Sequence, residues 1–168
     1  MPTIARLAAA GSLLLAFGCT AQIGVGPGEG SVQGDLQGLT LSCTAGVAIA
    51  RSFPPGTEIK IAPGGLACDA LKASDRITID LGDAVVGTYT VVRGYPAKPL
   101  LAGFQARAHA CAAQLPDGTT PPCHDQVRAG TVTITRYDPD PGGRIEGTFD
   151  VTFADGALSG SFSAARCT

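Results

Sequence analysis

The sequence has little charge and no long apolar run, and each shortage excludes a class of protein. Only 15% of the 168 residues are charged and like charges form no block, so the chain lacks the basic patch that nucleic acids or anionic membranes require. The longest apolar run, from Leu7 to Phe17, is about 11 residues, well short of the roughly 20 that cross a bilayer as a helix. A helical transmembrane protein is therefore excluded.

Residues with catalytic chemistry are equally scarce. The sequence contains no phosphate-binding glycine loop, no nucleophilic serine elbow and no Cys-His metal spacing. Cys123-His124-Asp125 holds the residue types of a nucleophile, a base and an orienting acid, but consecutive residues of an extended chain point in alternating directions. We therefore expect no catalysis and no cofactor or metal, with His124 and Asp125 capping a loop. A hydrolase or a two-histidine metal site using His109 and His124 is the alternative.

Glycine and proline are abundant instead. The 23 Gly and 12 Pro make long helices improbable, because both residues disfavour helix interiors. The apolar fraction of 45% is high enough to bury a core, which indicates one folded domain.

The N-terminus has the layout of a secretory signal peptide. One positive charge, Arg6, precedes the apolar run, which ends in Ala16-Phe17-Gly18-Cys19. This ending resembles the bacterial lipobox, and the resemblance implies that Cys19 is acylated with palmitate and becomes the new N-terminus. The alternative is an ordinary signal peptide cut near Ala21 or Gln22, which would discard Cys19 with the leader.

The lipobox resemblance predicts three segments: a signal peptide over 1–18, the lipidated Cys19 with a flexible Gly-rich tether over 19–37, and a folded domain over 38–168. Thr20 stands where an inner-membrane retention signal would have Asp, so outer-membrane sorting is expected. The chain thus resembles the small uncharacterised lipoproteins of the bacterial outer membrane, anchored in the cell envelope on its periplasmic or its surface face.

Apolar residues alternate with polar ones along most of residues 38–168. This period of two predicts strands over 39–49, 57–61, 76–81, 87–93, 102–111, 130–137, 145–153 and 158–164. The last three are expected to form an antiparallel meander, with Asp155-Gly156 as a hairpin turn. The sequence therefore predicts an all-β fold, either a single antiparallel β-sandwich or a small β-barrel of about eight strands.

Two details refine this expectation. Gly147 and Gly160 fall on inward positions beside aromatic residues, where a missing side chain leaves room for a ring and lets the sheet curl. On 102–111, Phe104 and the alanines are expected to form a dry face, and Arg107 and His109 a wet one.

The five cysteines after Cys19 are expected to meet an oxidising compartment. Cys111 and Cys123 bracket a Pro-rich loop, and a disulfide across its neck would stabilise the fold by about 3 kcal/mol. We predict a second bridge, Cys68–Cys167, with Cys43 as a buried free thiol. Cys43–Cys167 is the alternative pair.

These observations predict a lipid-anchored domain with a structural or binding role in the cell envelope. Its expected partners are the membrane, through the lipid, and an envelope protein. The alternative is a lipocalin-like barrel that binds a small apolar ligand in a pocket lined by Phe104, Phe149 and Phe162.

Overall fold

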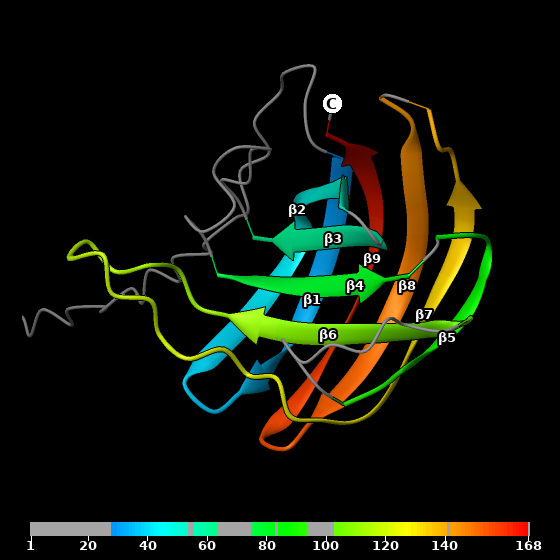
Figure 1. Cartoon of the computed structure of the whole chain (residues 1–168). Coiled ribbons are helices and arrows are strands. Elements are labelled where there is room, and N and C mark those ends of the chain that lie inside the picture. Colours follow the sequence, from blue (N-terminus) through cyan, green and yellow to red (C-terminus); the bar gives the residue numbers. More distant parts are fainter. Residues whose placement is uncertain are drawn as a thin grey trace, which may run out of the picture.

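The computed structural model describes residues 28–53, 56–63, 75–82, 84–93, 103–140 and 142–167, and these form a closed β-barrel (Figure 1). Its strands are β1 (Gly28–Leu36), β2 (Leu39–Phe53), β3 (Gly56–Ala62), β4 (Arg76–Leu81), β5 (Gly87–Val91), β6 (Gln105–Cys111), β7 (Val127–Tyr137), β8 (Arg144–Phe153) and β9 (Gly156–Arg166). The predicted all-β fold is confirmed, and of its two forms the chain adopts the barrel.

Neighbouring strands follow the order β1-β2-β3-β4-β6-β5-β7-β8-β9, and β9 pairs with β1 to close the barrel. Most pairs are antiparallel, as predicted. Two are parallel: β5 with β6, which lies between β4 and β5, and the ends of β2 and β9. The barrel is therefore mixed and has nine strands, one more than expected.

The additional strand is β1, whose glycine-rich composition led to its prediction as part of a flexible tether. The tether predicted over 19–37 is wrong for residues 28–36, while residues 19–27 lie outside the described residues. Gly28, Gly30 and Gly34 occupy alternate positions of β1, and a Cβ atom at Gly28 would lie 1.6 Å from the backbone oxygen of Ser163 on β9. Glycine here permits the close approach of two strands, a role that resembles flexibility when only composition is considered.

The meander of β7, β8 and β9 is confirmed, with the hairpin at Asp155-Gly156. Gly147 lies directly opposite Phe162, and Gly160 directly opposite Phe149. A Cβ atom at Gly160 would come within 2.8 Å of the Phe149 ring, so the ring occupies the space that the glycine leaves. The two predicted glycine–aromatic neighbours are therefore cross-strand pairs that pack together.

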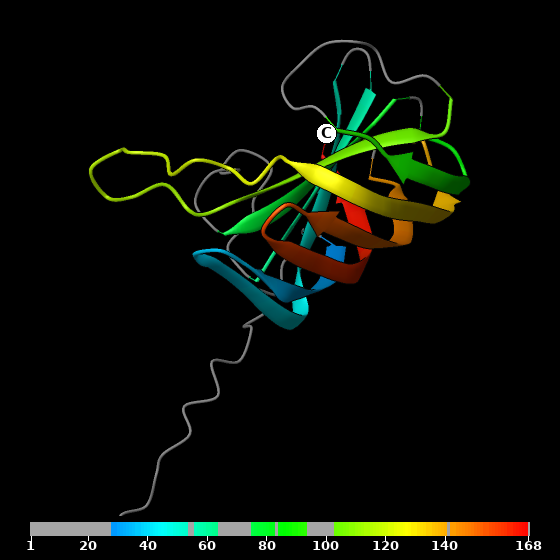
Figure 2. The same ribbon diagram turned by 90° about the horizontal axis from the view of Figure 1, so that it is seen from below.

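Buried side chains fill the barrel interior. One continuous cluster unites residues from all nine strands, including Leu41, Ile59, Ile79, Tyr89, Ala108, Val132, Phe149 and Phe162. Phe104, expected on the dry face, is instead 51% exposed, and its ring meets Tyr89 edge-on with 5.3 Å between the ring centroids. The segment between β6 and β7 extends away from the barrel as a long arm (Figure 2).

Candidate functional site

The most unusual region of the described barrel is the outer face of β3, β4 and β6. Alternation places Ile59, Ile79 and Ala108 inside and their neighbours outside, where solvent would be expected. The outward residues are nevertheless buried: Glu58, Lys60, Arg76, Thr78, Asp80 and His109 are all 9% exposed or less. The wet face predicted around His109 is therefore wrong, because alternation reports the side of a strand and not what covers that side.

Strand register aligns these residues in two rows. The first runs across four strands as Arg51, Glu58, Asp80 and Arg107, which gives two carboxylates flanked by two guanidinium groups. Glu58 Oε1 accepts hydrogen bonds from Arg51 Nε at 2.8 Å and from Lys60 Nζ at 2.9 Å. The charges thus compensate one another, as buried charges must.

The second row is Lys60, Thr78 and His109, from β3, β4 and β6. Thr78 is fully buried, and its hydroxyl oxygen makes no hydrogen bond with any residue that the structure describes. A hydroxyl that is buried without a partner costs free energy, so no hydrogen bond from Thr78 to the described residues contributes to the stability of this face.

Burial shifts three pKa values in this cluster. Desolvation raises the pKa of Asp80 to about 6, with a smaller contribution from the negative charge of Glu58. Desolvation lowers the pKa of His109 to about 4, and it also lowers the pKa of Lys60. Strongly shifted groups often mark functional sites. At 8% and 7% exposure, however, the Glu58 and Asp80 side chains are shielded from solvent-borne substrates.

The predicted staple Cys111–Cys123 is present at the edge of this face. Ala110 and His124 form an isolated antiparallel bridge with two backbone hydrogen bonds, so Cys111 and Cys123 lie opposite each other with 4.4 Å between their Cα atoms. This is the separation of a non-hydrogen-bonded pair, where cross-strand side chains approach most closely. The disulfide therefore closes the foot of the projecting arm.

The remaining cysteines only partly follow the prediction. Cys43 is disulfide-bonded, so the free thiol expected there is wrong. A strand pattern can show that a cysteine is buried, but it does not reveal a distant sulfur beside it. Cys167 is also disulfide-bonded, while Cys68, its predicted partner, and Cys19 lie outside the described residues.

His124 has a carboxylate partner that its sequence neighbours do not supply. Its Nδ1 lies 2.5 Å from Oδ2 of Asp155 in the β8–β9 turn, whereas the sequence predicted only that His124 and Asp125 cap a loop. Cys123 is bonded to Cys111 and supplies no thiolate nucleophile. Because directly paired residues share a face, His124 lies on the inward face with Ala110, opposite to His109.

That arrangement separates the two histidines. Among the described residues, no group of three or more His, Cys, Asp or Glu side chains is suitable for a metal ion.

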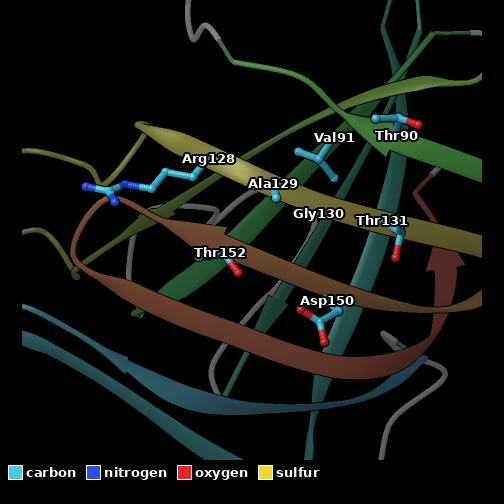
Figure 3. A pocket seen from close by; sticks show the side chains of 8 residues that line it. All are labelled: Thr90, Val91, Arg128, Ala129, Gly130, Thr131, Asp150 and Thr152. Carbon is cyan, nitrogen blue, oxygen red and sulfur yellow. The ribbon is translucent and has the colours of Figure 1, made fainter.

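A groove of about 570 Å³ lies farther round the barrel from β6, between the diverging strands β5 and β7 (Figure 3). Its lining comprises Thr90, Val91, Arg128, Ala129, Gly130, Thr131, Asp150 and Thr152. Val91 and Gly130 occupy inward positions and form an apolar floor, while the threonines provide hydroxyl groups. Arg128 and Asp150 contribute opposite charges.

No known protein family, curated protein or solved structure matches this chain. The part of the chain that the structure describes also contains no helix long and apolar enough to span a membrane.

Sequence reasoning missed both the buried charged face and the groove. A signal for the first exists: β3 and β4 each carry outward residues of both charge signs, β6 carries the outward Arg107 and His109, and the inward rows of all three strands are mainly apolar. A signal for the second is weaker, since Arg128-Ala129-Gly130 interrupts the alternation that resumes at Thr131.

Proposed function

We propose that the chain is an exported β-barrel held in the cell envelope by a lipid on Cys19, where it acts by binding on its outer surface. The observation that carries this proposal is the oxidation state of the cysteines. Cys43, Cys111, Cys123 and Cys167 are all disulfide-bonded, and such bonds persist in oxidising compartments outside the cytoplasm.

The position of β1 is consistent with a short anchor. Eight residues separate Cys19 from Gly28, the first residue of the barrel. A chain of that length spans at most about 30 Å when fully extended. A lipid on Cys19 would therefore keep the barrel close to the membrane surface, where envelope proteins and their exposed segments are concentrated.

The packing of the interior favours an external binding site over the lipocalin-like alternative. Phe149 and Phe162 pack over glycines of the opposite strands, and Phe104 lies at the surface. These three rings therefore do not line a common pocket. The described groove opens between β5 and β7 and contains none of them.

The anchor is tested by metabolic labelling with palmitate in a bacterial host that secretes the full chain. We expect the wild type to incorporate label and to fractionate with membranes, and Cys19→Ala to do neither. Equal labelling of the two proteins would refute the lipid anchor, because the label would then not depend on Cys19, the only residue of the motif that can be S-acylated.

The oxidised state is tested separately. Alkylation of the unfolded but unreduced protein should modify none of the four described cysteines. Recovery of an alkylated Cys43 would contradict the disulfide that underlies the export argument.

A further inference from the structure

The first residues of β7 have a paired strand on only one side among the residues that the structure describes. β5 pairs with β7 only from Thr131 to Ile134, whereas β8 accompanies β7 as far as Val127. Within the described residues, residues 127–130 therefore pair with β8 alone. Residues of a strand direct their backbone N–H and C=O groups alternately to the two sides. Apart from the Val127 N–H, which donates to the Asp125 carbonyl oxygen, the groups of residues 127–130 that point away from β8 have no partner strand among the described residues.

A β-bulge interrupts the pairing of this segment with β8. Val127 pairs with Phe153 and Ala129 with Thr152, which leaves Arg128 as the inserted residue. Bulges redirect side chains, and here Arg128 and Ala129 are both exposed although they are adjacent. Ala129 and Gly130 carry almost no side chain, so the backbone between them forms the wall of the groove.

The charges of the groove favour an occupant with both signs. Arg128 and Asp150 both line the groove, well apart from each other in Figure 3, and both are exposed. A nucleic acid or an anionic surface would meet repulsion at Asp150, whereas a polypeptide can present an acidic side chain to Arg128 and a basic one to Asp150. Four strand residues extend about 13 Å, which sets the length of peptide that pairs with the edge.

We propose that this groove binds an extended peptide segment of another protein, which adds as a strand to the free edge of β7. Backbone hydrogen bonds to residues 127–130 supply affinity, and Arg128 and Asp150 select a segment with an acidic and a basic residue. The site deepens the proposed surface-binding role. The location of the partner in the envelope rests on the proposed function. The binding of a peptide by the groove does not depend on that function.

The test uses the purified full chain and a displayed library of short random peptides. We expect selected peptides to contain an acidic and a basic residue and to slow hydrogen exchange of the backbone amides of residues 128–130. Ala129→Phe should abolish binding because the ring fills the groove, and Arg128→Glu should weaken it about tenfold or more through like-charge repulsion.

Two matched variants serve as controls. Thr148→Phe introduces the same ring on an exposed position of β8 outside the groove, and Arg144→Glu reverses an exposed arginine elsewhere on β8. Both should bind peptide as the wild type does, and circular dichroism should show that all four variants are folded.

The proposal is overturned if no peptide is selected, or if selected peptides bind Ala129→Phe normally and leave exchange in β7 unchanged. Neither outcome affects the palmitate experiment, so failure of the groove and failure of the anchor are distinguishable.

Discussion

The buried pair Asp80 and His109 predicts an unusual dependence of stability on pH, which the substitution Asp80→Asn should reveal. Both side chains lie on the covered outer face, from neighbouring strands β4 and β6. Their pKa values are shifted in opposite directions, so their contributions to the free energy of unfolding oppose each other over the same range of pH.

For Asp80, the pKa rises from 3.8 to about 6 on folding. The folded state therefore favours the protonated carboxyl group, and this contribution is complete below pH 3.8 and is lost as the pH rises through 6. A shift of this size corresponds to about 3 kcal/mol. Glu58 and Arg107 face Asp80 from β3 and β6, and their opposing charges are already included in that pKa.

For His109, the pKa falls from 6.5 to about 4. The folded state favours the neutral imidazole, so this contribution is complete above pH 6.5 and is lost as the pH falls through 4. Its size is also about 3 kcal/mol. Glu58 opposes the shift, while Lys60 and Arg76 add to it.

Acidification from pH 7 to pH 4 therefore stabilises the wild type through Asp80 and destabilises it through His109 by similar amounts. Asn imitates the protonated carboxyl group, so Asp80→Asn retains only the His109 contribution. We expect the variant to be more stable than the wild type by up to about 3 kcal/mol at pH 7.5, and the difference to vanish near pH 4.

Urea unfolding at a series of pH values, followed by circular dichroism because the chain has no Trp, measures this difference directly. The double variant Asp80→Asn/His109→Gln is the control, since it removes both groups. Because the two contributions cancel in the wild type, the difference in free energy of unfolding between this variant and the wild type should not change from pH 7 to pH 4. Parallel profiles for the wild type and Asp80→Asn would refute the reasoning, because they would show that Asp80 has the same pKa in the folded and unfolded states.

Three further substitutions test the architecture in urea unfolding. Replacing Cys111 and Cys123 together with Ala should lower the free energy of unfolding by about 3 kcal/mol, and an unchanged midpoint would show that the staple constrains nothing. His124→Ala and Asp155→Ala should each lower the free energy of unfolding by about 1 kcal/mol, and the double variant should lose less than the sum of the two single losses. A loss in the double variant equal to that sum would argue against their contact. Gly160→Ala should cost about 1–3 kcal/mol, because its Cβ would lie 2.0 Å from a backbone oxygen of β1, and a neutral effect would contradict that close approach.

The sequence by itself determined the features that depend on neighbouring residues. The alternation in β4 and β8 identified each strand and its inward row, because side chains on a strand point to opposite faces in turn. Asp155-Gly156 identified a hairpin, since few other residue pairs accept its backbone geometry. The bridge Cys111–Cys123 followed from a loop whose two ends had to meet.

Only the tertiary structure decided what lies against each strand. β1 has the composition of a linker, and its glycines became informative once β9 was seen to approach Gly28 closely. His124 found its carboxylate in the turn of another hairpin, at Asp155. The charged outward residues of β3, β4 and β6 are buried, which the sequence did not predict, because alternation defines only the side of a strand on which a residue lies and not the exposure of that side.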